Sequence, residues 1–307
     1  ERNIKMEQYL IGKTIKEFRL RNRLSQEKLA GTLCAVSTLS RIENGDQIPN
    51  WKLVEALFSK MGMAPPLHNV PMTEADLKRW NLEYEITNSI ANSNYETEVM
   101  LEKYRTCGLE LNTLELQFYI FQKALYNRHH NGTPEEIISL LEKSLRLSVK
   151  NFTPDTDLTG RLLTKTERLI LNNIALVLYD IKQEKRASAI LQFLITYFET
   201  QTISETEKAK DYPVILFNLS NWKGLDGKYE EALALSEKGI RECIIYGQLL
   251  IFPYLLFNKG YCLLGLKRTE NGKRSIERAL NFMDEIGKHG DASFGTQKIK
   301  EIFGIDI

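Results

Sequence analysis

The sequence contains few residues of the kinds that interrupt or cross-link a chain. Its 307 residues include only 18 glycines, 8 prolines and 4 cysteines. A low content of glycine and proline favours long, uninterrupted helices. The four cysteines are far apart and form no Cys-x-x-Cys pair, which argues against a disulfide framework or a zinc site. We therefore expect neither a metal nor a cofactor.

Long apolar runs are missing as well. The most apolar stretch, residues 244–257, is interrupted by Gly247, Gln248 and Pro253, and it is shorter than the roughly 20 residues that a membrane helix needs. The first ten residues carry scattered charges and no apolar segment, so we expect no secretory signal peptide. These absences predict a cytoplasmic protein that makes no contact with a membrane.

The formal net charge of +1 hides an asymmetry along the chain. Residues 1–68 contain 11 Lys and Arg against 7 Asp and Glu, whereas the remainder contains 30 against 33. A basic segment joined to a mildly acidic body is typical of a protein that meets a polyanion at one end. A solvated helix face would have the same composition, so charge alone leaves both interpretations open.

The first seventy residues have the pattern of four short helices. Apolar residues recur at helical spacing over residues 10–22, which predicts the first helix. Ser25 and Ser37 are expected to cap the second and third helices, and the third should end at Asn44-Gly45. A fourth helix is expected over residues 51–61.

The second and third of these helices are short and joined by a tight turn, and the later one begins with small hydroxyl residues. This is a helix-turn-helix arrangement. Its second helix must enter the major groove with its N-terminus first, where the positive end of the helix favours phosphate. An arginine one turn further on can reach guanine or the DNA backbone. The expected DNA contacts on this helix are Ser37, Thr38, Ser40 and Arg41.

Three segments of this region resemble the XRE or lambda-repressor type of helix-turn-helix: Gly12-x-x-Ile15-x-x-Phe18-Arg19, Leu24-Ser25-Gln26-Glu27-x-Leu29-Ala30 and Ser40-Arg41-Ile42-Glu43-Asn44-Gly45. The resemblance implies that Arg19 pairs with Glu43 in a structural role. It also implies that Gln26 contacts DNA. The turn over residues 33–37 is one residue shorter than the common form of this family, and in this respect it is similar to the PlcR branch of regulators.

The proline-rich stretch at residues 63–71 predicts an interdomain connection, and a sequence repeat follows it. Residues 211–218 return as residues 251–258, each with an aromatic residue, then proline, then asparagine five positions later. The units resemble tetratricopeptide (TPR) repeats, and weaker matches elsewhere predict five helical hairpins and a terminal helix over residues 293–303. Such hairpins must stack, because none can bury its apolar face alone.

The expected fold is therefore all-α. A lambda-repressor-like helix-turn-helix domain should occupy residues 1–66, followed by a linker over residues 67–76. A TPR-like right-handed α-superhelix should occupy residues 77–307 and serve peptide binding and dimerisation.

The first helix of each hairpin is expected to line the concave face of this array. Residues three apart share a helix face, and asparagine amides can satisfy an extended peptide backbone. The same asparagines could instead bond to helix backbone, and aromatic residues at this spacing could belong to the core. The expected peptide contacts are Lys123, Tyr126, Asn173, Asn218, Asn221, Tyr254, Asn258 and Tyr261.

A helix-turn-helix domain of this type followed by a TPR array resembles the RRNPP group of Gram-positive peptide-pheromone regulators, notably its PlcR and Rgg branches. The resemblance implies a homodimeric transcription regulator of quorum sensing that binds a double-stranded DNA operator and is switched by a short signalling peptide. One alternative is a regulator of the same architecture controlled by a protein partner. Another is a TPR module that sequesters a protein without binding DNA. An enzyme is not expected, because no nucleophile-base pair, glycine-rich phosphate loop or metal-ligand spacing is present.

Overall fold

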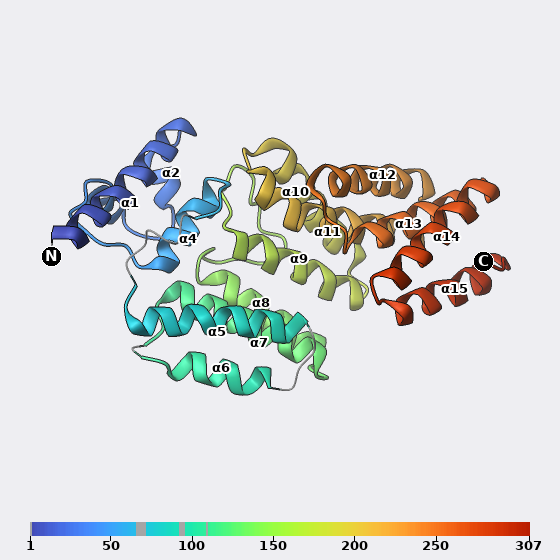
Figure 1. Ribbon diagram of the computed structural model, residues 1–307, viewed down its shortest axis with the longest axis horizontal. Coiled ribbons are helices and arrows are strands. Elements are labelled where there is room, and N and C mark those ends of the chain that lie inside the picture. The colour runs from blue at the N-terminus through green and yellow to red at the C-terminus, as the bar shows by residue number, and fades with distance from the viewer. Residues whose placement is uncertain (1, 66–71, 92–95, 109) are drawn as a thin grey trace. The chain divides into compact units, whose positions relative to one another are not determined.

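The computed structural model describes residues 2–65, 72–91, 96–108 and 110–307, and the regular elements over these ranges are all helices (Figure 1). The all-α prediction is therefore confirmed. The chain divides into two compact units, Glu1–Ile190 and Leu191–Ile307. The first unit contains the helix-turn-helix head together with the first helices of the array.

Four helices form the head: α1 (Arg2–Arg21), α2 (Gln26–Ala30), α3 (Val36–Glu43) and α4 (Trp51–Lys60). The predicted cap at Ser25 is confirmed, because its side chain accepts a hydrogen bond from the Lys28 amide at 3.1 Å. Asn50 caps α4 in the same way, accepting from the Leu53 amide at 2.8 Å. Gly45 follows α3 in a left-handed conformation with φ of 80°, as expected for the end of that helix.

The predicted cap at Ser37 is wrong. The N-cap of α3 is Ala35, which contributes no side-chain hydrogen bond, and Ser37 lies in the first turn. The helix starts earlier because the Leu39 amide bonds to the Ala35 carbonyl at 3.1 Å, while Leu39 and Ile42 are fully buried in the head. Burial of these two apolar residues fixes the helix start more strongly than a hydroxyl cap does.

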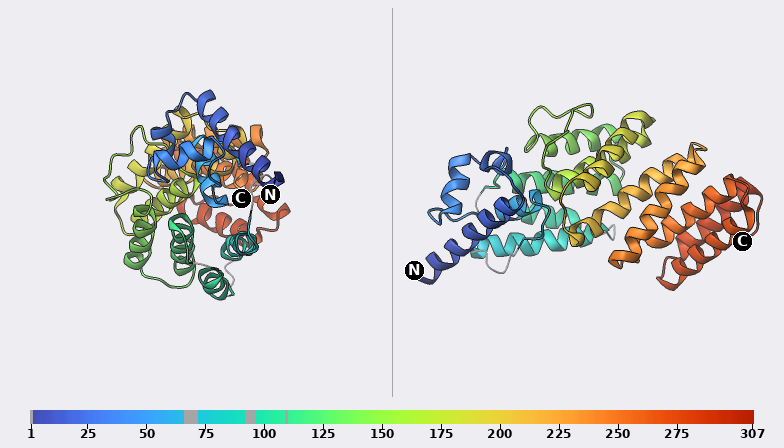
Figure 2. Two further views of the ribbon diagram at one scale, coloured as in Figure 1. Left: turned by 90° about the vertical axis from the view of Figure 1, so that its left-hand side faces the viewer. Right: turned by 90° about the horizontal axis from the view of Figure 1, so that it is seen from above.

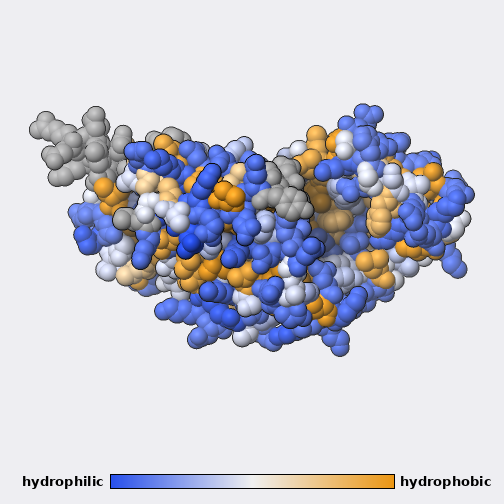
Figure 3. All heavy atoms as spheres, turned by 90° about the horizontal axis from the view of Figure 1, so that it is seen from below, coloured by the Kyte–Doolittle hydropathy of each residue, from blue (hydrophilic) through white to orange (hydrophobic). Residues whose placement is uncertain are grey.

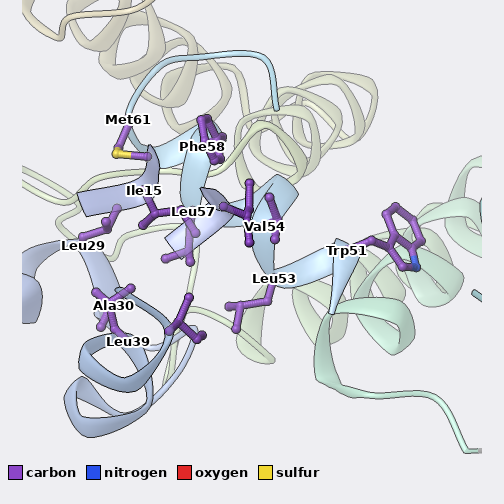
Figure 4. Close-up of a cluster of buried hydrophobic side chains, with 12 residues drawn as sticks. Ile15, Leu29, Ala30, Leu39, Trp51, Leu53, Val54, Leu57, Phe58 and Met61 are labelled. Carbon is purple, nitrogen blue, oxygen red and sulfur yellow. The ribbon is translucent and has the colours of Figure 1, made fainter. Parts of the chain in front are cut away.

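The core of the head joins all four helices. In Figure 4, Ile15 of α1, Leu29 of α2 and Leu39 of α3 lie on the side of α4 that carries Leu57, whereas Trp51 stands apart at the start of that helix. Helices α1 and α3 touch through their backbones, since a Cβ atom added at Gly12 would lie only 1.9 Å from the Ile42 carbonyl oxygen. This contact explains why a glycine occupies that position of the motif.

The rest of the first unit contains α5 (Glu74–Ala91), α6 (Thr97–Thr106), α7 (Thr113–His129), α8 (Pro134–Arg146) and α9 (Lys165–Asp180). Helices α5 and α6 pack together, as do α7 and α8. The capping box at the start of α8 joins Thr133 and Glu136, with Pro134 in the first turn. Helix α5 begins within the predicted linker over residues 67–76, of which residues 67–71 lie outside the described residues.

Helix α10 (Glu184–Thr200) crosses the boundary between the units. The second unit continues with α11 (Glu205–Leu225), α12 (Tyr229–Tyr246), α13 (Phe252–Gly265), α14 (Thr269–Glu285) and α15 (His289–Phe303). Seen from above in Figure 2, these helices follow one another in chain order as hairpins. The predicted hairpins α5–α6, α7–α8, α11–α12 and α13–α14 are confirmed by the packing of their helices. The terminal helix is confirmed as well, although it begins at His289 rather than at residue 293.

The two matching proline segments occupy different places in their helices. Pro253 lies in the first turn of α13, where a missing amide is tolerated. Pro213 lies inside α11, because Ser204 caps that helix further upstream by accepting from the Glu207 amide.

Hydrophilic residues predominate on the face shown in Figure 3, where hydrophobic residues form small separate patches. Over the described ranges, no helix combines the length and the apolar character that crossing a membrane requires.

Candidate functional site

Helix α3 presents a polar face to solvent. Ser37 and Arg41 are exposed, and Thr38 and Ser40 are half-buried. Leu39, on the opposite face, is fully buried in the head core. Three hydroxyl groups and one guanidinium group are therefore displayed on one short helix, which is the chemistry that phosphate and base edges require.

A buried polar network holds this helix in place. Arg19 of α1 forms two charged hydrogen bonds to Glu43 of α3, from Nε at 2.6 Å and from Nη2 at 2.8 Å. It also donates to the Leu24 carbonyl at 2.8 Å. The structure thus brings together the two residues of the expected structural pair and connects three segments of the head through them.

Gln26, at the start of α2, belongs to the same network. Its amide donates to Glu43 at 2.7 Å, and its side chain is half-buried. Burial alone would raise the pKa of Glu43, but the hydrogen bonds from Arg19 and Gln26 outweigh it and lower the pKa. Glu43 is therefore ionised at neutral pH, and Gln26 is fixed beside α3.

The basic residues around the network point outward. Between Gly12 and Arg41 every lysine and arginine except Arg19 is exposed: Lys13, Lys16, Arg21, Arg23, Lys28 and Arg41. The positive charge of the head is therefore available to a polyanion.

Within the first unit the head is fastened to the helical array. Lys52 of α4 pairs with Glu83 of α5 at 2.6 Å, and Tyr104 donates to the same carboxylate at 2.6 Å. Thr32, in the turn between α2 and α3, donates to the carbonyl of Ser148. Sequence patterns carry no sign of these contacts, because each joins residues distant along the chain.

The three expected peptide contacts of the first unit lie on α7 and α9. Lys123 is exposed. Tyr126 is half-buried, donates to Glu98 at 3.4 Å and stacks on His130 with ring centroids 4.2 Å apart. Asn173 donates to the Leu169 carbonyl of its own helix at 2.9 Å, which is the local bond that asparagine often makes inside a helix.

Three of the five expected contacts in the second unit are accessible. Asn218 and Asn221 of α11 are half-buried, as is Tyr254 of α13. Tyr254 lies edge-on to Phe217, with ring centroids 5.9 Å apart, and its hydroxyl donates to Asp291 of α15. Burial, together with this hydrogen bond, raises the pKa of Tyr254 to about 12.

The other two residues of this set are buried. Asn258 is 7% exposed and donates to the Ser220 hydroxyl at 3.0 Å. Tyr261 is 9% exposed and packs edge-on against Phe303 of α15, with ring centroids 5.1 Å apart. Both have neighbours from other helices, so they offer less surface to a ligand than Asn221 or Tyr254 does.

Ser220, Asp291 and Phe217 were not among the expected site residues, although each touches one of them. Ser220 and Phe217 belong to α11, and Asp291 belongs to α15. Spacing within one helix cannot reveal such partners, because they come from helices that are brought together only by packing.

The N-terminal region matches the family model of the helix-turn-helix domain over residues 10–69. No curated protein matches the sequence. Similar solved structures include PlcR of Bacillus thuringiensis in complex with the peptide PapR7 and DNA, with 19% identity and a TM-score of 0.62. This similarity covers 93% of the present chain and 98% of PlcR.

Two streptococcal structures are also similar. ComR of S. thermophilus, solved with DNA and its signalling peptide ComS, is 18% identical, with a TM-score of 0.51 over 96% of the present chain and 100% of ComR. A cysteine-to-serine variant of the SHP pheromone receptor Rgg2 of Streptococcus dysgalactiae is 16% identical, with a TM-score of 0.50 over 95% of the present chain and 99% of Rgg2. The fold of this chain is thus similar to that of PlcR, ComR and Rgg2 over more than nine-tenths of its length.

Proposed function

We propose that this chain is a cytoplasmic, homodimeric transcription regulator of quorum sensing that binds operator DNA through α3 and is switched by a short signalling peptide. In this proposal residues 1–66 form the DNA-binding domain and residues 67–76 the linker. Residues 77–307 form the peptide-binding and dimerisation domain. The structures similar to this chain include regulators solved with DNA and a signalling peptide, which supports the proposal.

The observation that carries the proposal is the outward face of α3. Ser37 and Arg41 are exposed while the buried Arg19–Glu43 pair fixes the helix from behind. A rigid helix with accessible hydroxyl and guanidinium groups can enter the major groove without reorganisation. Two such heads in a dimer would read half-sites about 34–36 Å apart.

The DNA-binding role is tested by fluorescence anisotropy of the full chain on duplexes selected from a random pool. Replacing Arg41 by alanine should cost about 1–3 kcal/mol of operator affinity. Ser37→Ala should weaken binding by a smaller amount. Arg241→Ala, which removes an exposed arginine of the second unit, is the matched control. Equal affinity of the Arg41 and Arg241 variants would refute the assignment.

We propose that the peptide binds the α11 and α13 face that carries Asn218, Asn221 and Tyr254. Two asparagine amides one turn apart offer donors and acceptors to a peptide backbone, and Tyr254 with Phe217 offers an aromatic surface. Asn258 and Tyr261 form the buried part of this face. Lys123, Tyr126 and Asn173 are the corresponding candidates in the first unit.

The peptide role is tested by thermal shift and calorimetry with synthetic peptides encoded by small open reading frames beside the gene. Asn218→Ala and Asn221→Ala should abolish the response to the active peptide and leave DNA binding without peptide unchanged. Asn281→Ala is the matched control, because Asn281 is an exposed residue of α14 outside this face. An undiminished response in the Asn218/Asn221 double variant would exclude this face as the peptide site.

We assign dimerisation to an exposed apolar segment at the end of α12 and just after it. Ile244, Ile245, Leu249 and Leu250 are 68%, 67%, 59% and 72% exposed, and such a cluster marks an interaction surface more often than a free one. In sedimentation experiments, Ile245→Glu/Leu250→Glu should be monomeric. Leu225→Glu, at another exposed leucine of the unit, should remain dimeric. A dimer that survives the double substitution would show that another surface mediates association.

A further inference from the structure

A cavity of about 580 Å³ lies in the second unit, bounded by α12, α13 and α14. Its volume is within the range of small-molecule binding sites, roughly 300–1,000 Å³. Leu233, Leu256 and Leu263 contribute apolar surface, whereas α14 contributes mainly polar and basic side chains. The cavity is therefore apolar on one side and cationic on the other.

The cavity lies on the face of α13 opposite to the proposed peptide face. Successive helix residues are rotated by about 100°, so Leu256, Lys259 and Leu263 share one side of α13. Tyr254, Asn258 and Tyr261 share the other side by the same geometry. A ligand of the cavity would therefore be distinct from the peptide, and the inference does not depend on the proposed function.

The charge in the cavity is unbalanced. Four cationic side chains and two carboxylates line it. Both carboxylates are already engaged, because Glu237 pairs with Lys259 at 2.9 Å and Glu230 lies 3.5 Å from Arg268. The two arginines of α14, Arg274 and Arg278, have no carboxylate of the cavity left to pair with.

Arg274 and Arg278 form no ion pair or hydrogen bond with any residue that the structure describes, and both are exposed toward the cavity. They are four residues apart and lie on one helix face, where two like charges repel each other. Guanidinium groups bind the oxygens of phosphate or carboxylate in a bidentate manner. A doubly charged anion between them would remove the repulsion and satisfy both groups.

We propose that this cavity binds a doubly charged anion carried on a short aliphatic body, such as an organic phosphate. The anion would lie between Arg274 and Arg278, and the aliphatic part would rest on Leu256 and its apolar neighbours. Among the described residues, no aromatic side chain lines the cavity, so nothing there would stack on a nucleobase.

The test is isothermal calorimetry of the full chain with hexyl phosphate at low ionic strength. One site per chain is expected, with affinity at least about tenfold higher than for inorganic phosphate and no measurable binding of hexanol. Stronger binding of inorganic phosphate than of hexyl phosphate would overturn the aliphatic part of the proposal. Absence of binding by either phosphate would overturn it entirely.

Substitutions locate the site. Arg274→Gln and Arg278→Gln should each weaken hexyl phosphate binding at least about tenfold, whereas Arg241→Gln, an exposed arginine of α12 outside the cavity, should not. Circular dichroism of each variant should match that of the unaltered chain, because both arginines are exposed. Equal affinities of the Arg274, Arg278 and Arg241 variants would show that the phosphate binds elsewhere and would refute the assignment.

Discussion

Replacing Glu43 alone by leucine would leave the Arg19 guanidinium buried in the head without its charge partner. The two side chains are only 9% and 1% exposed, and two charged hydrogen bonds join them. Removing one partner of such a pair costs about 3–5 kcal/mol, because the remaining charge stays desolvated. This is a large share of the roughly 5–15 kcal/mol that stabilises a typical domain.

Replacing both partners should be far less costly. In Arg19→Met/Glu43→Leu no buried charge is left, and apolar side chains of similar volume fill the space. We expect a double-mutant cycle to give a coupling energy of at least about 2 kcal/mol. The free energy of unfolding of the double variant should lie within about 1 kcal/mol of that of the unaltered chain.

The assay is urea unfolding followed by tryptophan fluorescence. Trp51 is buried in the head core, so a chain carrying Trp80→Phe and Trp222→Phe keeps only this reporter of the three tryptophans. A loss of 3–5 kcal/mol lowers the urea midpoint by about 2 M when m is about 2 kcal/mol/M. Additive effects of the two single substitutions would refute the view that the pair acts as one unit.

Acidification probes the same pair. Because the pKa of Glu43 is lowered in the folded chain, its stabilising contribution is complete above the ordinary glutamate pKa of about 4.3. That contribution is lost as the pH falls through the lower, folded-state pKa. Between about pH 5 and pH 2 the unaltered chain should therefore lose more stability than Arg19→Met/Glu43→Leu does. Parallel pH profiles would contradict the assignment.

Three further substitutions test packing. Gly12→Ala should destabilise the head by about 1–3 kcal/mol through its clash with α3, whereas Gly290→Ala, at an open helical site, should be neutral or stabilising in urea unfolding. Lys52→Met should destabilise the chain, and more at about pH 8 than at about pH 5. Burial raises the pKa of Glu83 to about 7 even though Lys52 acts to lower it. Without Lys52 this pKa rises further, so the variant continues to lose stability above pH 7, where the unaltered chain no longer does; equal losses at both pH values would argue against this explanation. Asn258→Leu should cost about 1–2 kcal/mol in thermal unfolding by leaving the buried Ser220 hydroxyl without its donor, and an unchanged midpoint would show that this bond contributes little.

Features that depend on neighbouring residues could be predicted from the sequence. The cap at Ser25 is local, since its side chain accepts a hydrogen bond from an amide three residues away. The Ser37 cap failed because burial of Leu39 decides where α3 begins. The Lys52–Glu83 contact had no signal at all, because a buried ion pair between helices follows from packing and leaves no periodic pattern.

Helix register predicts direction but not exposure, and α13 shows why. The spacing of Tyr254, Asn258 and Tyr261 places them on one side of the helix. The exposure of each residue on that side depends on its neighbours from α11 and α15. Ser220 of α11 covers Asn258, and Phe303 of α15 covers Tyr261. Tyr254 stays half-buried. The opposite side of α13 carries leucines that resemble ordinary core, so spacing alone predicted no site there. Its neighbour α14 places Arg274 and Arg278 along the same cavity. The proposed anion site is therefore formed by residues of different helices, and the pattern of each helix taken separately did not predict it.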